Sequence, residues 1–289
     1  MSGRAPANEE FLRAELPGGI ELHYLDRGDG PPLLLLHGGM GDCRSWAPQV
    51  ECFAHRFRVV APSRRHSSPN RNPVATTTRP LDWDAEDLAA FQNLLDIGPA
   101  HVVGTSYGAL VALVHALRHP AKVLSLVLAE PPLHPWSGRT KDGAVLYAAF
   151  MADVWLIAAA AFERGDDRRA MQVLTDGMWG RPAFESLPPV RVEAVLRNAS
   201  AMKALTQAID PFPDLDRNAV ARLTSPVLLL RGEHASPLHA RVVDELAGVL
   251  PFASRAVIAG AGHGSPVENA DAFNAAVLGF LTGQERSPS

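Results

Sequence analysis

Cysteine is nearly absent from this chain. Its 289 residues include two, Cys43 and Cys52, with no Cys-x-x-Cys pair and no ligand spacing around them. Two isolated thiols are too few for a disulfide framework and lack the pattern of a structural zinc site. We therefore expect two reduced thiols and no bound metal.

An excess of positive charge is also lacking. The chain has 27 Lys and Arg against 31 Asp and Glu, a formal net charge of -4, and the basic residues are scattered except for the pair Arg64 and Arg65. Nucleic acids are bound through a basic surface that counters the phosphates. We expect no nucleic-acid partner.

Long hydrophobic runs are missing as well. The longest, residues 146–162, contains Asp153 and is shorter than the ~20 residues that cross a bilayer. Residues 1–10 are polar and carry acids where a secretion signal needs an apolar run. We expect a cytoplasmic protein with no membrane partner and read the run as a buried or lid helix. Monomer and homodimer both stay open.

What the chain does have is a 47% hydrophobic composition, enough for a large core in one α/β domain or two smaller domains. Residues 20–25 alternate as an outer antiparallel strand would. Short apolar runs predict buried parallel strands, with helical patterns between them. The runs are residues 33–36, 58–61, 101–103, 123–128, 227–230 and 255–258, and the helical patterns are residues 81–97, 107–119 and 267–281.

One interval breaks the alternation. Residues 133–222 contain no strand pattern, only Ala-rich helical sequence cut by proline clusters. We predict a helical cap over residues 133–222, inserted into a core domain made of residues 1–132 and 223–289.

The clearest chemical motif is Gly104-Thr-Ser-Tyr-Gly108, between a strand and a helix. A serine on such a turn is exposed at the top of the sheet beside the N–H groups of the helix N-terminus. A serine hydroxyl needs a base, normally histidine, and a third group that orients the imidazole. We predict Ser106 as the nucleophile and His263, in the Gly-rich loop after the last strand, as the base.

A second glycine-rich motif, His37-Gly38-Gly39, follows another strand. Here the backbone N–H of Gly39 is expected to form an oxyanion hole with that of Tyr107. His37 itself is expected to support this loop, not to act as a base.

Taken in order, these motifs and the helical insert resemble the α/β-hydrolase fold family over nearly the whole chain. The resemblance implies a mostly parallel eight-stranded sheet with helices on both faces, a cap over the pocket, and a triad in the order Ser, acid, His. Dehalogenases and epoxide hydrolases of that fold attack with Asp, whereas position 106 is Ser. We therefore expect neither of those activities.

The triad acid departs from the family's common pattern. The turn after the seventh strand reads Arg-Gly-Glu-His-Ala, with Ala235 where the acid usually stands. Some members use a carboxylate just after the sixth strand, and Glu130 holds that place, followed by two prolines. We favour Glu130 as the acid, with Glu233 as the alternative.

Specificity residues are harder to assign. The loop Ser63-Arg-Arg-His66 replaces a common family sequence, and a structural role is favoured for Arg64 and His66, although either could reach the pocket. Aromatic residues of the insert suggest a mainly apolar pocket, although core packing explains most of them equally well. The candidate pocket residues are Met40, His66, Trp136 and Trp155.

These residues predict a cofactor-free serine hydrolase for an ester, lactone or thioester of a small to medium organic substrate. Two alternatives remain. The Ser106 and His263 pair could serve a cyclisation, elimination or carbon–carbon cleavage, or the protein could be a ligand-binding receptor with a dormant triad.

Overall fold

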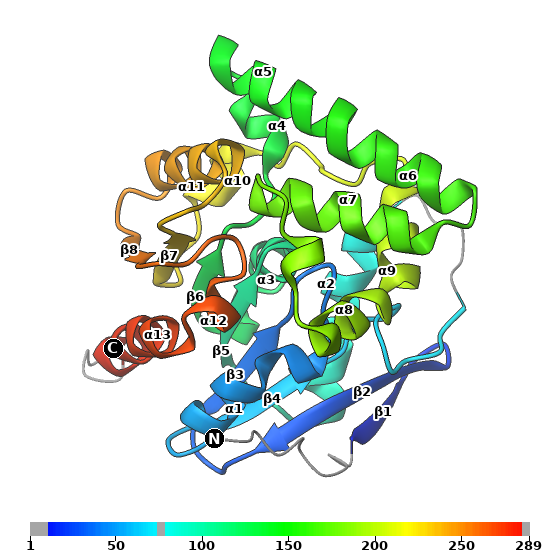
Figure 1. Cartoon of the computed structure of the whole chain (residues 1–289). Coiled ribbons are helices and arrows are strands. Elements are labelled where there is room, and N and C mark those ends of the chain that lie inside the picture. Colours follow the sequence, from blue (N-terminus) through cyan, green and yellow to red (C-terminus); the bar gives the residue numbers. More distant parts are fainter. Residues whose placement is uncertain (1–10, 74–78, 285–289) are drawn as a thin grey trace.

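A single eight-stranded sheet organises the protein, as a computed structural model describes it for residues 11–73 and 79–284 (Figure 1). The strand order is β1-β2-β4-β3-β5-β6-β7-β8. β1 and β2 are antiparallel additions at one edge, and β3 to β8 run parallel. The strands are β1 (Leu12–Leu16), β2 (Ile20–Arg27), β3 (Pro32–Leu36), β4 (Arg58–Pro62), β5 (Ala100–Thr105), β6 (Val123–Ala129), β7 (Val227–Gly232) and β8 (Ser254–Ile258).

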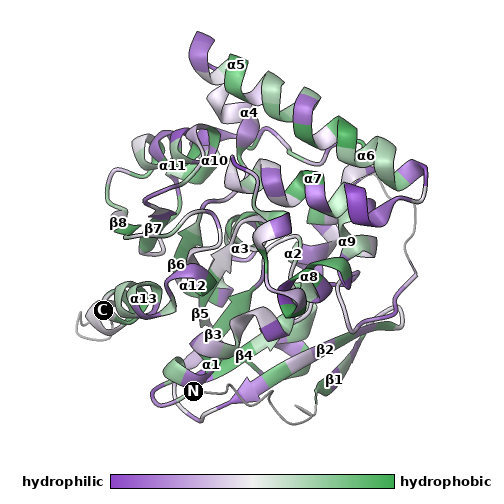
Figure 2. Cartoon of the chain, viewed as in Figure 1, coloured by the Kyte–Doolittle hydropathy of each residue, from purple (hydrophilic) through white to green (hydrophobic). Residues whose placement is uncertain are grey.

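The apolar strand sequences follow from burial of both sheet faces. In β3, Leu34 and Leu36 contact one hydrophobic core, whereas Leu33 and Leu35 contact the other. Successive side chains of a strand point to opposite faces, so a strand covered on both sides has no polar positions to alternate with. Hydrophobic residues accordingly dominate the central strands (Figure 2). The predicted parallel α/β sheet is confirmed.

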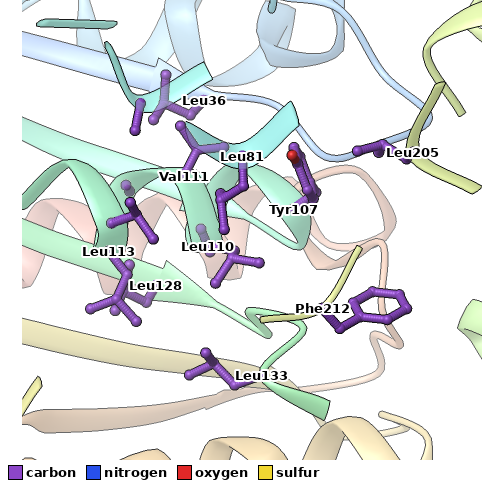
Figure 3. Close-up of a cluster of buried hydrophobic side chains, with 14 of the residues drawn as sticks. Leu36, Leu81, Tyr107, Leu110, Val111, Leu113, Leu128, Leu133, Leu205 and Phe212 are labelled. Atoms are coloured by element: carbon purple, nitrogen blue, oxygen red, sulfur yellow. The ribbon is translucent and has the colours of Figure 1, made fainter. Parts of the chain in front are cut away.

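Helices from both ends of the chain cover these faces. One face packs against α2 (Pro80–Leu94), α3 (Tyr107–Arg118) and α11 (Pro237–Val249). Leu110, Val111 and Leu113 of α3 lie close to Leu36 and Leu128 of the sheet in this core (Figure 3). The other face packs against α1 (Ala47–Phe53) and α13 (Ala270–Gln284).

The chain between β6 and β7 is helical and lies beyond the carboxyl ends of the strands (Figure 1). Treating it as a separate cap domain with the predicted boundaries stays a prediction. Its helices are α4 (His134–Ser137), α5 (Lys141–Phe150), the π-helical turn Met151–Trp155, α6 (Leu156–Glu163), α7 (Asp167–Trp179), α8 (Pro189–Leu196), α9 (Ala199–Thr206) and α10 (Arg217–Ala221), with a 3₁₀ turn at Phe184–Ser186.

The π turn joins α5 and α6 into one helix, Lys141–Glu163, longer than the apolar run seen in the sequence. By length and composition this helix could cross a membrane: its most apolar 18-residue window has a mean hydropathy of 1.9, and 28% of that window is buried. One such helix is weak evidence, because core helices of soluble proteins meet the same criteria. The expected absence of a membrane partner and the cytoplasmic location stay predictions.

Two details differ from the sequence prediction. Strand β1 was not predicted, and the C-terminal helical pattern is split into α12 (Ser265–Glu268) and α13. The split occurs because Asn269 leaves helical geometry and its Oδ1 accepts a hydrogen bond from Ala272 N, which caps α13. Residues 1–10, on which the expected lack of a secretion signal rests, lie outside the described residues.

Candidate active site

Ser106 stands on the sharp turn between β5 and α3. Its φ of 52° lies in the left-handed region, unusual for a residue with a side chain, and its N–H donates to Ala129 O at 2.7 Å. The turn needs its two glycines. A Cβ on Gly104 would lie 2.5 Å from Gly108 O, and one on Gly108 would lie 2.2 Å from Leu36 O. The motif therefore holds a strained serine at the carboxyl edge of the sheet.

Glu130 directly follows the neighbouring strand β6 and also has a positive φ, of 48°. Its carboxylate is buried and accepts two hydrogen bonds. Gly232 N donates to Oε1 at 2.8 Å, and Oε2 lies 2.7 Å from His263 Nδ1. Burial raises the pKa of Glu130, but the hydrogen bond and electrostatic interaction with His263, the nearby His239 ring and the hydrogen bond from Gly232 N outweigh it and lower the pKa overall. The carboxyl group is therefore ionised.

His263 links these two residues. Its Nε2 lies 3.0 Å from Ser106 Oγ, while its Nδ1 faces the Glu130 carboxylate. A carboxylate can only accept, so Nδ1 carries the proton and Nε2 is free to accept the serine proton. The chain Ser106–His263–Glu130 has the hydrogen-bond order of a nucleophile, a base and an orienting acid.

Glu233, the alternative acid, has a different neighbour. It is exposed, and its Oε2 accepts a hydrogen bond from Gly260 N at 2.7 Å. This bond fixes the turn after β8 that precedes His263. Glu233 thus contacts the backbone of the histidine loop and not the imidazole.

The loop after β3 brings Gly39 to Ser106. Gly39 and Ser106 line the same two cavities, and Tyr107 opens α3, so its N–H has no acceptor within the helix. His37 supports this loop. Its Nδ1 donates to Gly38 O at 2.8 Å and its Nε2 accepts from Arg64 N at 3.0 Å. Burial and the Arg64 charge lower the pKa of His37 to about 3, so it is neutral.

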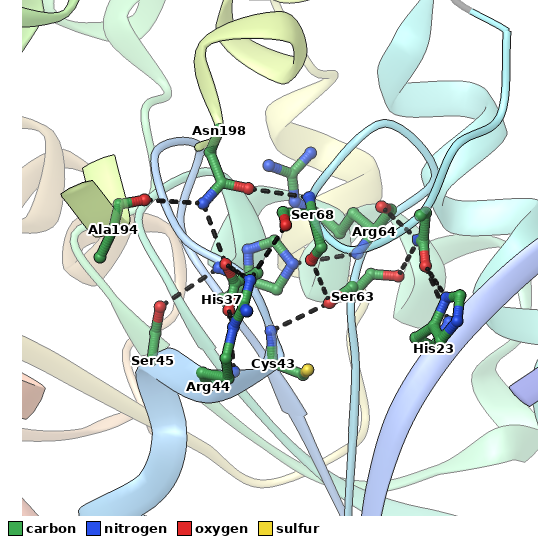
Figure 4. A network of polar contacts seen from close by, with 12 residues as sticks. His23, His37, Cys43, Arg44, Ser45, Ser63, Arg64, Ser68, Ala194 and Asn198 are labelled. Carbon is green, nitrogen blue, oxygen red and sulfur yellow. Dashed lines mark hydrogen bonds and ion pairs between the residues drawn. The ribbon is translucent and has the colours of Figure 1, made fainter. Parts of the chain in front are cut away.

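Arg64 is a buried clamp on the same loop. Its guanidinium lies 3.0 Å from Asp84 Oδ2, donates to the carbonyls of Gly38 and Gly39 at 3.4 and 3.3 Å, and stacks 4.6 Å from the Tyr107 ring centre. These contacts give Arg64 the loop-tying role favoured from the sequence. Close by, Asn198 joins the end of α8 to the core. Its amide contacts Asp42 and Ser68 (Figure 4).

Two cavities meet at Ser106. The larger, about 170 Å³, is lined by Ser106, His263, residues of α7 and α8, and the start of α12. The smaller, about 30 Å³, is lined by Ser106, Tyr107 and apolar side chains of the insert, among them Trp155, Met178, Met202 and Phe212. Of the predicted pocket residues, Met40 lines both cavities and Trp155 lines the smaller one.

Trp136 and His66 are not brought to either cavity. Trp136 is fully buried, its indole N–H donates to Leu215 O at 3.0 Å, and Arg217 covers its ring. His66 lies partly buried in the loop after β4. The sequence shows that these side chains are aromatic, but it does not show which way they point.

A buried histidine that the sequence analysis missed, His239, lies against His263 and Glu130. The His239 ring stacks on that of His263, with centres 4.2 Å apart and planes 16° apart. Its Nδ1 lies 2.9 Å from Ser236 Oγ and 3.8 Å from Glu130 Oε2. Burial holds the pKa of His239 well below its usual value, so it is neutral. The Ser-Pro-x-His sequence at the start of α11 was the available signal.

Glu130, His239 and His263 are close enough to be considered as metal ligands among the described residues. An imidazole binds a metal through an in-plane nitrogen lone pair. Because the two rings are stacked and nearly parallel, their lone pairs run side by side and do not converge on one ion. The arrangement fits a hydrogen-bonded triad better than a metal centre.

Comparison with known proteins gives the same fold. The family model described as alpha/beta hydrolase fold matches residues 31–270. The enol-lactonase from Burkholderia xenovorans LB400 superposes with a TM-score of 0.75 at 23% identity, covering 94% of this chain and 100% of that one.

Two curated relatives carry hydrolase names. Carboxylesterase YbfK of Bacillus subtilis is 26% identical over 258 residues, 88% of this chain and 81% of its own length. A 2-hydroxy-6-oxononadienedioate/2-hydroxy-6-oxononatrienedioate hydrolase of Burkholderia vietnamiensis is 27% identical over 272 residues, 91% of each protein. The first name describes an esterase and the second a hydrolase of a different compound.

Proposed function

The chain belongs to the α/β-hydrolase fold family, and from that premise we propose that it is a serine hydrolase which cleaves an ester, lactone or thioester through an acyl-enzyme. The observation that carries this proposal is the hydrogen-bond chain in which His263 Nε2 lies 3.0 Å from Ser106 Oγ and Nδ1 lies 2.7 Å from Glu130 Oε2. The name of the carboxylesterase relative adds support.

In the first step, Ser106 Oγ attacks the carbonyl carbon while its proton passes to His263 Nε2. The imidazolium that forms carries its positive charge against the Glu130 carboxylate. Because Glu130 is buried and ionised, that charge is stabilised more strongly than it would be in water. His263 then gives the proton to the leaving oxygen or sulfur, and the bond to the carbonyl carbon breaks.

The negative charge of the tetrahedral intermediate is assigned to the N–H groups of Gly39 and Tyr107. Backbone donors fixed in advance need no reorganisation as the charge develops. The Arg64 clamp on the Gly38 and Gly39 carbonyls supports this assignment, because it fixes the peptide groups on either side of Gly39. In the second half-reaction, water gives its proton to His263 and attacks the acyl carbon, and Ser106 leaves with that proton.

Replacement of the serine tests the proposal. Ser106→Ala should reduce 4-nitrophenyl butyrate hydrolysis to background while circular dichroism stays unchanged, because one hydroxyl on a turn contributes little packing. Thr175→Val is the matched control. Thr175 lines the larger cavity, but its hydroxyl donates to Met171 O in its own helix, so this variant should keep most activity. If Ser106→Ala kept most of the activity, the proposal would be wrong.

A further inference from the structure

Arg191 places a positive charge in an otherwise nearly uncharged cavity. It is the third residue of α8 and lines the larger cavity beside Ser106. Among the residues described for that lining, Arg191 and His263 are the ionisable ones, and none is a carboxylate. An anion entering this cavity therefore meets one guanidinium and no acid in the wall.

The guanidinium of Arg191 has no hydrogen bond or ion pair within residues 11–73 and 79–284, whereas Arg64, Arg65 and Arg217 each hold a carboxylate. Burial lowers the pKa of Arg191, and the charge of Glu268 partly opposes this. Glu268 forms no ion pair with Arg191 among the described residues; its carboxylate accepts from the Trp179 indole N–H and from Gly262 N, and its charge acts on Arg191 only at longer range. Partial burial of a guanidinium that has no hydrogen-bond partner costs desolvation free energy, and the binding of an anion would offset that cost.

The helix that carries Arg191 is fixed to the core. Asn198, two residues beyond the end of α8, donates to Asp42 Oδ2 at 3.1 Å and accepts from Ser68 N at 2.9 Å (Figure 4). It also donates to Ala194 O within α8 at 3.1 Å. The guanidinium is thus presented to the cavity from an anchored helix.

The two cavities suit different parts of the substrate, the leaving group in the larger one and the acyl group in the smaller one. His263 lines the larger cavity and is absent from the lining of the smaller one. The leaving group must lie beside His263, because it receives its proton from Nε2. The smaller cavity, walled by Trp155, Met178, Met202, Leu205 and Phe212, suits a short apolar acyl group.

We propose that Arg191 binds a carboxylate on the leaving group, so that the substrate is an ester of a short apolar acid with a hydroxy acid. This inference rests on the proposed function and names the substrate class of the same site. A monoanionic carboxylate matches a single fork of N–H donors in an apolar wall, whereas a phosphate dianion calls for more donors than Arg191 offers.

Three substrates of similar size test the proposal. 4-Acetoxybutanoate carries the carboxylate on the leaving group, 4-acetoxybutanamide replaces it with a neutral amide, and monobutyl succinate carries it on the acyl group. The wild-type protein should cleave 4-acetoxybutanoate with a kcat/KM at least tenfold above that of the other two. A factor of ten corresponds to about 1.4 kcal/mol, close to the lower end of the ~1.5–3 kcal/mol of a hydrogen bond to a charged group.

Substitutions then assign the preference to Arg191. Arg191→Gln should raise KM for 4-acetoxybutanoate with little change in kcat. For 4-acetoxybutanamide, kcat/KM of this variant should stay within about threefold of the wild-type value. Arg191→Lys should keep part of the preference. Arg197→Gln is the matched control, since Arg197 follows the same helix, is exposed and does not line the cavity, and it should behave as wild type.

Two results would overturn the inference. One is that the wild type cleaves 4-acetoxybutanoate and 4-acetoxybutanamide equally well, and the other is that Arg191→Gln keeps the preference for 4-acetoxybutanoate. Either result would show that Arg191 does not bind the leaving group. In both cases the ester bond of 4-acetoxybutanamide is still cleaved, and the serine-hydrolase proposal stands. If a fluorophosphonate failed to label Ser106 and no ester was cleaved, the proposed function would fail and this inference with it.

Discussion

Exchange of Glu130 for glutamine tests the orientation of His263, the proposed catalytic base. The Glu130 carboxylate accepts from two donors, Gly232 N at one oxygen and His263 Nδ1 at the other. A glutamine has one acceptor oxygen. If that oxygen faces Gly232, the amide NH₂ faces His263 and favours a proton on Nε2, the tautomer that cannot accept the Ser106 proton. If the oxygen faces His263, two donors oppose each other at Gly232.

The loss also includes the charge that stabilises the imidazolium. The equivalent Asp-to-Asn change in a serine protease triad lowers kcat by about 10⁴. We expect Glu130→Gln to lower kcat by two orders of magnitude or more, about 3 kcal/mol in activation free energy. Glu233→Gln should change kcat by less than about threefold, because its amide oxygen can still accept from Gly260 N in an exposed turn.

The assay compares kcat of the two variants on one neutral ester, with circular dichroism and thermal unfolding to show that both are folded. A crippled Glu233→Gln beside a nearly normal Glu130→Gln would refute the reasoning. The triad acid would then follow β7, and Glu130 would close the end of β6 for structural reasons.

Three further outcomes are expected. Arg64→Gln should lower kcat by about 10- to 100-fold with little change in KM, since it frees the loop that carries the proposed oxyanion donor Gly39. Arg65→Gln should not lower kcat, because the Arg65 guanidinium pairs with Asp87 instead; equal effects of the two substitutions on kcat would contradict the role given to Arg64. His134→Leu should stabilise the fold by about 1–3 kcal/mol at pH 7, because neither nitrogen of the buried His134 ring has a hydrogen-bond partner among the described residues. Burial lowers the pKa of His134 to about 3, so below pH 6.5 the unfolded wild-type chain binds a proton at this residue that the folded protein does not bind. The stability gain of His134→Leu over the wild type should therefore be about 2 kcal/mol larger at pH 5 than at pH 7. Urea unfolding at both pH values measures this gain, and the same gain at both would count against a neutral buried ring. Hydrolysis should survive EDTA, because the Ser106 mechanism uses no Lewis acid, whereas loss of activity restored by a divalent ion would speak against that mechanism.

Prediction from the sequence succeeded where local pattern and fold agree. The apolar runs correctly predicted the parallel strands. Because both faces of the sheet are covered by helices, successive residues of the central strands are mostly buried, and their sequences need no polar alternation. Strand β1 was not predicted because it pairs only with β2 at the sheet edge, and only Ala14 and Leu16 of its five residues are buried, so it has no continuous apolar run. The division between α12 and α13 at Asn269 was not predicted because the helical apolar pattern continues across it, whereas the break comes from a side-chain cap on α13.

At the candidate site, residues at strand ends could be placed from the sequence, because parallel strands bring their carboxyl ends to one edge. Ser106, Glu130 and His263 all follow strands. Side chains of the insert could not be placed in this way. Trp136 packs away from the cavities, while Arg191 enters one of them, and the difference depends on how helices from distant parts of the chain pack.

Covalent capture of the nucleophile tests the central claim most directly. The protein would be treated with a fluorophosphonate, and intact mass with peptide mapping would locate the adduct. The account predicts one adduct per chain, on Ser106, lost in Ser106→Ala and formed much more slowly in Glu130→Gln. An unmodified Ser106 in a protein that still hydrolyses esters, or an adduct on another residue with activity abolished, would contradict it.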